Sequence, residues 1–416
     1  MERRAFLKQS ATMAGVAAVG PSFTDVELPA SITALAQQQP AVSPITDSER
    51  LARIEKARRL MTENGIAAMF IEGGTSMAYF TGTRWGNSER PFGVVIPAKG
   101  ELAWVTPGFE EERARELIKF GKDIRVWQED ESPYKVIAGI IKDRGGATGK
   151  IAFEERVRFF IADGVQKELP NAKATIATPV TAGCRMIKSA AEIALMQRAN
   201  DITHQAITET MKSLKEGMTQ RDISASVGAI TRRLGGNGDG ALVGLGKFSA
   251  FPHGSIQPQK LQEGDIVLID AGCTVEAYTS DITRTTVFGK PTQRQRDVWE
   301  LEKRAQSAAF KAAQVGATCA SVDAAARKVI TDAGFGPDYK VPGLPHRTGH
   351  GIGMDGHEWT NFVRGNTTKI QPGMCFSDEP MIAIYGEFGI RLEDCLHITE
   401  AGPKFFTPQS ESIEKP

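Results

Sequence analysis

Short apolar runs alternate with amphipathic segments in the first half of the chain. The stretch "DSERLARIEKARRLMTENGI" (residues 47–66) has apolar positions at helical spacing and predicts a helix that stops near Gly65. The runs "AAMFIEG", "FGVVIPAKGELAWVTP", "IRVWQED" and "KIAFEE" predict strands, the second of them a hairpin that turns near Lys99-Gly100. The segments "EEERARELIKFG" and "YKVIAGIIKDRG" predict helices between them. Strands that alternate with helices predict an α/β domain over residues 47–180.

A long helical pattern over residues 189–218 opens a second expected domain, residues 181–403. A further helix is expected to begin at the cap Thr219, and "DIVLIDAGCTV" and "YTSDITRTTVFG" predict strands. The remaining pattern predicts two helices and then three strands, at residues 292–315, 321–333, 374–380, 389–393 and 395–399. Residues 404–416 are expected to form a C-terminal tail. The predicted fold class is α/β with α+β character.

Composition and the N-terminus limit the classes of function. The 50 basic and 50 acidic side chains cancel, so no net charge favours nucleic acid or an anionic membrane surface. No apolar run reaches the roughly 18–20 residues that span a bilayer. "RRAFLK", a mildly apolar stretch and "ALA" predict a twin-arginine signal peptide over residues 1–36, and hence export to the periplasm or medium. A linker is expected over residues 37–46. Five scattered cysteines without a C-x-x-C pair predict buried thiols rather than a disulfide framework.

Four carboxylates stand in or beside apolar strands of the second domain. They are Asp270 in "IVLIDAG", Asp281 in "SDITRTT", Glu379 in "SDEPMI" and Glu393 in "GIRLEDCLHIT". Each has an ordinary explanation: a strand-end cap for the aspartates, a surface or salt-bridged Glu379, and an Arg391–Glu393 ion pair. Together in one core, however, they could not all ionise without cations. Two divalent metals would resolve this, and a mainly oxygen ligand set favours Mn²⁺ or Co²⁺ over thiolate-type zinc.

The stretch "HRTGHGIGMDGHE" (residues 346–358) holds three of the six histidines. His346 and His350 have the spacing of a helical zinc pair. The glycines at 349, 351 and 353 each weaken a helix by up to about 1 kcal/mol, so a glycine-shaped strand or loop is expected instead. One imidazole from this stretch would complete the metal ligands.

In this order, the motifs "IDAG", "SDITRT", "HRTGHGIGMDGHE", "DEP" and "RLED" resemble the pita-bread metallopeptidases, in the aminopeptidase P and prolidase branch. The resemblance covers residues 189–401, and the first domain resembles the creatinase-type N-terminal domain of that branch. Methionine aminopeptidases share the second domain but generally lack such a first domain. The resemblance implies that Asp281 and Glu393 bridge two metals, that Asp270 chelates one, and that His350 and Glu379 hold the other.

The resemblance also implies roles in catalysis. A metal-bridging hydroxide would attack the scissile carbonyl, with Glu379 as its proton acceptor. His253 and His357 match the histidines that contact substrate and the developing tetrahedral centre, although a lone histidine such as His253 is more often a hydrogen-bonded loop residue. Arg391 matches an arginine that would brace the ligands. His204 and His397 are expected to serve structure.

Other positions are weaker candidates or depart from the family pattern. His346 is expected to line the substrate pocket. Trp85 and Arg90, in the loop "TRWGNSERP", are candidates for a substrate wall, which in related oligomers can reach a neighbouring subunit. Ala277 stands before Tyr278, where the family often has glycine, and is expected to alter the turn but not metal binding.

The expected function is hydrolysis of an N-terminal Xaa–Pro bond with two divalent ions per subunit, Mn²⁺ first and Co²⁺ or Zn²⁺ as alternatives. The first expectation is an Xaa-Pro aminopeptidase and the alternative an Xaa-Pro dipeptidase (prolidase). A metal-free creatinase-like hydrolase or a non-catalytic binding protein ranks below both, because such proteins lose ligands that this chain keeps. The expected partners are a peptide with proline at its second position and, in a homodimer or larger homo-oligomer, further copies of the chain.

Overall fold

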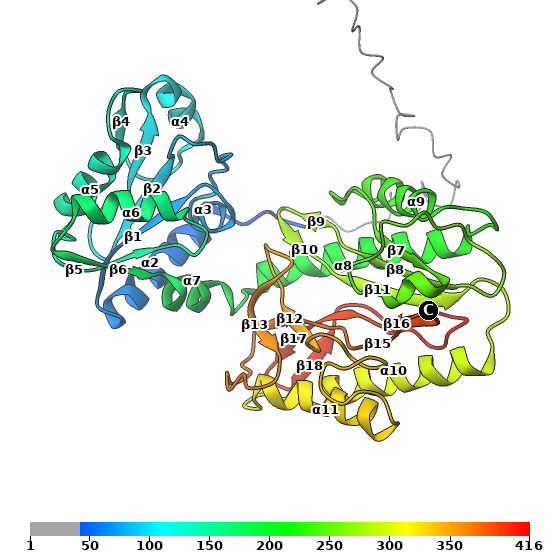
Figure 1. Ribbon diagram of the computed structural model, residues 1–416. Coiled ribbons are helices and arrows are strands. Elements are labelled where there is room, and N and C mark those ends of the chain that lie inside the picture. The colour runs from blue at the N-terminus through cyan, green and yellow to red at the C-terminus, as the bar shows by residue number, and fades with distance from the viewer. Residues whose placement is uncertain (1–41) are drawn as a thin grey trace, which may run out of the picture.

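The protein is seen here in a computed structural model that describes residues 42–416. The predicted signal peptide and the first part of the linker lie outside the described residues. Figure 1 shows two domains side by side, with the N-terminal domain on the left and the larger C-terminal domain on the right. In the described part of the chain, no helix has the length and apolar character needed to cross a membrane.

The N-terminal domain is built on one six-stranded sheet. Its strand order is β4-β3-β2-β1-β5-β6, with β1–β2 and β2–β3 antiparallel and the other pairs parallel. The strands are β1 (Ile66–Glu72), β2 (Gly93–Pro97), β3 (Ala103–Pro107), β4 (Asp123–Trp127), β5 (Gly149–Phe153) and β6 (Ala172–Ile176). The helices are α2 (Asp47–Glu63), α3 (Thr75–Thr81), α4 (Glu111–Leu117), α5 (Pro133–Asp143), α6 (Phe159–Glu168) and α7 (Thr178–Arg185), with a short 3-10 turn, η1 (Gly108–Glu110).

Alternating side chains of this sheet build two cores, one on each face. Met69 of β1 and Trp104 of β3 belong to the core that also contains α2, α3 and α7. Phe70 and Val105 belong to the opposite core, with α5 and α6. The alternation is what the pleat of a strand dictates, and it confirms the predicted α/β domain. The predicted hairpin at Lys99-Gly100 joins β2 to β3, whereas α3, α6 and α7 were not predicted.

The C-terminal domain places strands between two pairs of helices (Figure 1). The helices are α8 (Ala190–Lys212), α9 (Gln220–Arg233), α10 (Gln293–Ala312) and α11 (Cys319–Asp332). One core joins α8 and α9 to a three-stranded sheet of order β11-β8-β7, and another joins α10 and α11 to the later strands. The strands of the first half are β7 (Leu242–Leu245), β8 (Ile266–Ala271), β9 (Thr274–Val275), β10 (Tyr278–Thr279) and β11 (Ile282–Val287), with the 3-10 turn η2 (Gly246–Ala250) after β7.

The second half of this domain supplies a five-stranded sheet of order β13-β12-β14-β17-β18 and the hairpin β15-β16. These strands are β12 (Gly349–Gly351), β13 (Glu358–Phe362), β14 (Cys375–Asp378), β15 (Met381–Ile384), β16 (Phe388–Arg391), β17 (Asp394–Thr399) and β18 (Gly402–Phe405). Two predicted domain boundaries fall inside secondary-structure elements. The boundary at 180/181 lies in α7, whose Val180 and Cys184 pack in the N-terminal core, and the boundary at 403/404 lies in β18, which pairs with β17.

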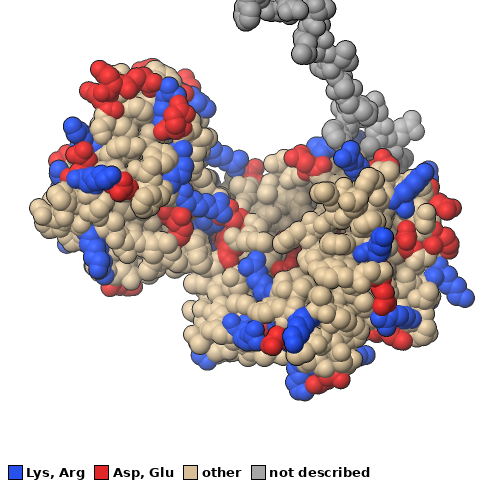
Figure 2. All heavy atoms as spheres, in the orientation of Figure 1, with Lys and Arg blue, Asp and Glu red and all other residues tan. Residues whose placement is uncertain are grey.

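Two buried clusters of polar and charged side chains join the domains. Arg53 of α2 donates to the hydroxyl of Tyr278 at 3.0 Å and lies 3.3 Å from Glu192 of α8. Arg185, at the end of α7, and Lys188 form ion pairs with Glu358. Elsewhere the surface carries interspersed basic and acidic side chains, as Figure 2 shows for one face. All five cysteines are buried and free, which confirms that prediction.

Candidate active site and metal centre

Asp270 lies on one strand and Asp281 immediately before its neighbour, which is close to the arrangement that their spacing predicted. β8 and β11 pair antiparallel, with Asp270 opposite Thr283, and Asp281 directly precedes β11. The chain between them makes the β9–β10 hairpin, whose two turn residues, Glu276 and Ala277, have φ angles of 48° and 70°. Two positive φ values at such a turn favour Asn and Gly, so Ala277 occupies a strained position.

His350 reaches the same place from β12. Its Nε2 atom lies 3.3 Å from Oε1 of Glu379 and 3.8 Å from Oδ2 of Asp281. The neighbouring glycines allow this approach: a Cβ on Gly349 would stand 2.1 Å from the carbonyl oxygen of Ser377, and one on Gly351 would stand 2.5 Å from that of Trp359. The predicted glycine-shaped strand is therefore present, and close packing of backbone explains its glycines.

The tautomer of His350 is also determined by its surroundings. Its Nδ1 atom lies 3.1 Å from the carbonyl oxygen of Gly351, which can only accept, so Nδ1 carries the proton. Burial lowers the pKa of His350 to about 3, which keeps the ring neutral. The lone pair of Nε2 is thus directed toward Asp281 and Glu379. A neutral imidazole in this orientation is suited to bind a metal.

Glu393 completes the group. Its backbone bridges to Thr283, whose hydroxyl donates to Glu393 Oε2 at 2.7 Å. The other oxygen, Oε1, is buried and has no hydrogen-bond partner among the described residues. Ligand atoms from Asp281, His350 and Glu393 all lie within 4.8 Å of one another. An orphaned carboxylate oxygen beside two further ligand atoms fits a bound cation.

Electrostatics support the same interpretation. Burial, together with repulsion from Asp270 and Glu379, raises the pKa of Asp281 well above its ordinary value. Burial likewise raises the pKa of Glu393, again with the neighbouring carboxylates, and raises that of Glu379 to about 7. These carboxylates need positive charge beyond that of the protein in order to ionise together, and divalent cations would supply it.

Arg391 is the protein's own cation at this site. It forms an ion pair with Asp270 and lies 3.9 Å from Oε2 of Glu393. Its Nε also donates to the Thr283 hydroxyl at 3.0 Å, and its Nη1 to the carbonyl oxygen of Pro252 at 3.0 Å. Arg391 therefore connects two carboxylates to the segment that carries His253, so the simple Arg391–Glu393 pair is only part of its contacts.

The candidate substrate histidines lie beside the predicted metal ligands. The ring centroid of His357 lies 4.1 Å from that of His350. Burial lowers the pKa of His346 to about 4, and the nearby charges of Arg391 and His253 act in the same direction. His346 donates through Nδ1 to the carbonyl oxygen of Arg347 at 2.7 Å, and its Nε2 is buried without a partner in the described structure.

The two N-terminal candidates lie farther from this chemistry. Trp85 stacks on Phe92, with 3.9 Å between ring centroids, and lines an interdomain groove of about 300 Å³ with Thr75 and Met354. Arg90 instead forms a surface ion pair with Glu129 at 2.8 Å. Within one chain, neither residue has a described contact with the predicted metal ligands. A role as a substrate wall would therefore require the active site of a neighbouring subunit.

Arg347 was missed as a functional candidate, although it stands inside the quoted histidine motif. Its positive charge lowers the pKa of Glu379 and of His357, where in both cases burial is the larger influence, so its charge acts on both groups. The dipeptide "HR" within "HRTGHG" is the only signal of it in the sequence.

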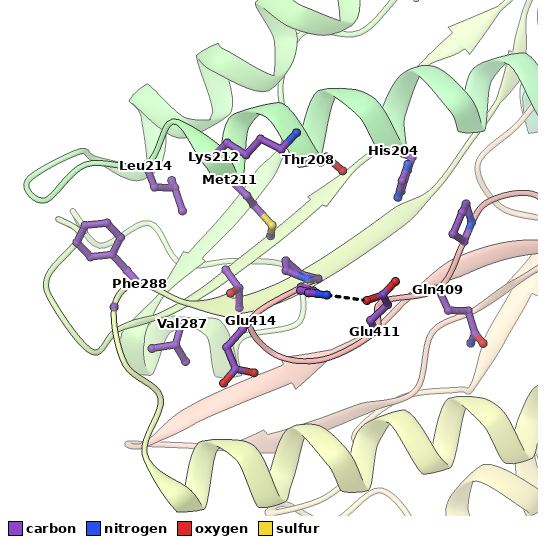
Figure 3. Close-up of a pocket in the computed structure, with 15 residues that line it drawn as sticks. His204, Thr208, Met211, Lys212, Leu214, Val287, Phe288, Gln409, Glu411 and Glu414 are labelled. Atoms are coloured by element: carbon purple, nitrogen blue, oxygen red, sulfur yellow. Dashed lines mark hydrogen bonds and ion pairs between the residues drawn. The ribbon is translucent and has the colours of Figure 1, made fainter.

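A separate cavity of about 700 Å³ lies away from the metal centre (Figure 3). Side chains of α8, among them His204 and Met211, face residues of the C-terminal segment such as Gln409 and Glu411 across it. Burial lowers the pKa of His204. None of the residues predicted to take part in catalysis lines this cavity.

Strands between paired helices, with Asp281, His350 and Glu393 meeting beside Asp270 and Glu379, are the arrangement expected of a metal-dependent hydrolase of the pita-bread fold. Comparison with known proteins identifies the family. The Metallopeptidase family M24 profile matches residues 194–400, and the Creatinase/Prolidase N-terminal domain profile matches residues 53–187. The chain belongs to metallopeptidase family M24, which confirms the predicted fold and family.

Individual relatives match nearly over their full length. The Xaa-Pro dipeptidase of Lactobacillus delbrueckii subsp. lactis is 31% identical over 366 residues, which is 87% of this chain and 98% of that protein. The structure of the dipeptidase PepE from Mycobacterium ulcerans aligns with a TM-score of 0.81 at 30% identity and covers 89% of this chain and 98% of that one. An X-Pro aminopeptidase from Thermotoga maritima aligns with a TM-score of 0.74 at 27% identity over 86% and 98% of the two chains.

Proposed function

We propose that this protein is an Xaa-Pro dipeptidase that works with two divalent metal ions. The proposal rests on the cluster of Asp281, His350 and Glu393, which has Glu379 and Asp270 beside it, in a chain whose curated relatives of matching length include Xaa-Pro dipeptidases. The sequence motifs alone put an aminopeptidase first and a dipeptidase second. The relatives support the reverse order.

These five residues would hold the two cations, and the chemistry supplied by bound divalent ions is polarisation of a carbonyl and a lowered pKa of water. The protein's own residues do the rest. Arg391 holds Asp270 by an ion pair, and Ser377 donates to Glu379 Oε1 at 3.3 Å. We assign to the Glu379 carboxylate the acceptance of the water proton, and to His357, beside His350, a hydrogen bond to the substrate.

Arg347 favours a dipeptide over a longer peptide. Its charge acts on Glu379 and His357, and its guanidinium has no described hydrogen bond or ion pair of its own. The C-terminal carboxylate of an Xaa-Pro dipeptide is only a few bonds beyond the scissile carbonyl, and a guanidinium binds such a group in bidentate fashion. A longer peptide has an uncharged amide at that point.

The metal and the location of the protein belong to the same proposal. Four carboxylates and one imidazole favour Mn²⁺, with Co²⁺ and Zn²⁺ as alternatives. The twin-arginine motif supports export to the periplasm or the medium, and the interdomain position of Trp85 suits a homo-oligomer in which that residue faces a neighbouring active site.

A product analysis tests the activity. The Mn²⁺-loaded protein is given equal concentrations of Ala-Pro, Ala-Pro-Ala and Ala-Ala, and the products are identified by mass. We expect release of alanine and proline from Ala-Pro, with much slower cleavage of the other two. Faster cleavage of Ala-Pro-Ala would instead establish the aminopeptidase. Preferred cleavage of Ala-Ala would exclude the proposed specificity for proline.

A further inference from the structure

Two small buried residues stand directly opposite each other behind the metal ligands. Ser377 of β14 pairs with Cys395 of β17 in the antiparallel ladder. Both side chains are inaccessible to solvent. Directly opposed residues of an antiparallel pair project to the same face of the sheet, so the hydroxyl and the thiol share one side.

Ser377 holds two of the ligand residues. Its hydroxyl oxygen accepts the backbone N–H of His350 at 3.0 Å, and its proton is donated to Oε1 of Glu379 at 3.3 Å. A single hydroxyl can make both bonds at once, because one uses the lone pair and the other the proton. Ser377 therefore sets the position of His350 relative to the Glu379 carboxylate.

Cys395 holds a third ligand residue by its backbone. Its thiol lies 3.1 Å from the carbonyl oxygen of Asp281, which can only accept, so the sulfur carries the proton that is donated. The same sulfur accepts the backbone N–H of Asp281 at 3.3 Å. Asp281 directly precedes Ile282, the first residue of the β8–β11 ladder. The thiol thus secures both polar backbone groups of a ligand that stands at the end of its strand.

We propose that Ser377 and Cys395 are positioning residues of the metal centre, which together set the relative places of Asp281, His350 and Glu379. A buried cysteine is more often an inert filler of the core. Here its sulfur forms hydrogen bonds with a proposed ligand residue, Asp281. Removal of a group that orients a metal ligand typically lowers metal affinity by about 10–100-fold. The inference rests on the proposed metal-dependent function.

Metal binding to the full-length apoprotein tests this role without any assay of activity. Mn²⁺ affinity is measured by competition with a chelating dye for the wild type, Cys395→Ala, Cys395→Ser and Ser377→Ala. Cys319→Ala is the matched control, because Cys319 is also a buried thiol but lies in the core around α11. The visible spectrum of bound Co²⁺ reports ligand geometry in each protein.

We expect Cys395→Ala and Ser377→Ala to weaken Mn²⁺ binding by about 10–100-fold and to alter the Co²⁺ spectrum. Cys395→Ser, which keeps a donor and an acceptor, should stay within a few-fold of the wild type, and Cys319→Ala should match it. Wild-type affinity and spectrum in Cys395→Ala, or an equal loss in Cys319→Ala, would overturn the role of Cys395. A wild-type protein that binds no ion would overturn the proposed function and this inference with it.

Discussion

The interdomain carboxylate Glu358 is where a single substitution should reveal how the two domains are held together. Glu358 follows His357 and is almost inaccessible to solvent. Its Oε2 lies 3.0 Å from Nζ of Lys188, and its Oε1 forms an ion pair with Arg185 and accepts the backbone N–H of Met354 at 2.9 Å. We expect Glu358→Gln to leave Lys188 buried without a counter-charge and to leave Arg185 paired with Asp355 alone.

The magnitude follows from the pKa of Glu358. Burial by itself would raise this pKa, but attraction to Lys188 and Arg185 is stronger and lowers it from an ordinary 4.5 to about 2. A difference of that size corresponds to roughly 3 kcal/mol of stability, since each pKa unit is worth about 1.4 kcal/mol. Because the folded pKa is the lower one, this stability is fully present above pH 4.5 and is lost as the pH falls toward 2.

Urea unfolding followed by tryptophan fluorescence measures the effect. At pH 7 Glu358→Gln should lower the free energy of unfolding by roughly 3 kcal/mol. At pH 3 the difference from the wild type should fall below half of that, because the wild type has then lost most of the contribution. Glu129→Gln, which breaks the surface pair with Arg90, is the control and should cost much less. A small effect of Glu358→Gln at pH 7, or one that does not depend on pH, would refute the reasoning.

Three further predictions concern the turn, the specificity and the metal. Ala277→Gly should raise the free energy of unfolding by about 1 kcal/mol, because Ala277 has a φ of 70°; a lower urea midpoint would contradict this. Arg347→Gln should raise KM for Ala-Pro about 10-fold or more but leave KM for the amide Ala-Pro-NH₂ unchanged; equal changes would exclude a carboxylate contact. Exhaustive chelation should abolish hydrolysis and Mn²⁺ should restore it; full activity after chelation would exclude metal catalysis.

The interdomain cluster also has a consequence for catalysis. Asp355 accepts from Thr75 at 2.7 Å and from Arg185 at 2.7 Å, so the N-terminal domain holds the loop immediately before His357. Glu358 holds the same loop from the other side. The N-terminal domain therefore also fixes the loop that leads to His357, the residue that we place against the substrate.

The cluster of residues that we propose as metal ligands could be predicted because each stands in a local pattern that has few explanations. Asp270 stands near the end of an otherwise apolar strand and Asp281 directly precedes the next strand of that sheet, so a hairpin brings them together. Glycines beside His350 exclude a helix and allow the backbone to approach β14 and β13. These features depend on neighbours in sequence, which is the information that a single chain displays.

The residues that were missed depend on contacts between distant segments. Cys395 could be predicted as a buried thiol, but its bond to Asp281 spans 114 positions. Glu358 meets Arg185 across 173 positions, so its neighbour His357 was noticed and Glu358 itself was not. Short helices such as α3 carry too few turns for a periodic pattern. No local signal in the sequence reveals which side chains form such long-range contacts.

The count of Mn²⁺ ions bound per chain tests the central claim most directly. The full-length protein is loaded with Mn²⁺, dialysed and analysed by mass spectrometry of the elements, beside a Glu393→Gln variant. We expect about two ions per chain in the wild type and clearly fewer in the variant, because Glu393 is expected to bridge both. One ion or fewer in the wild type, or two in Glu393→Gln, would contradict a dinuclear centre built from these five residues.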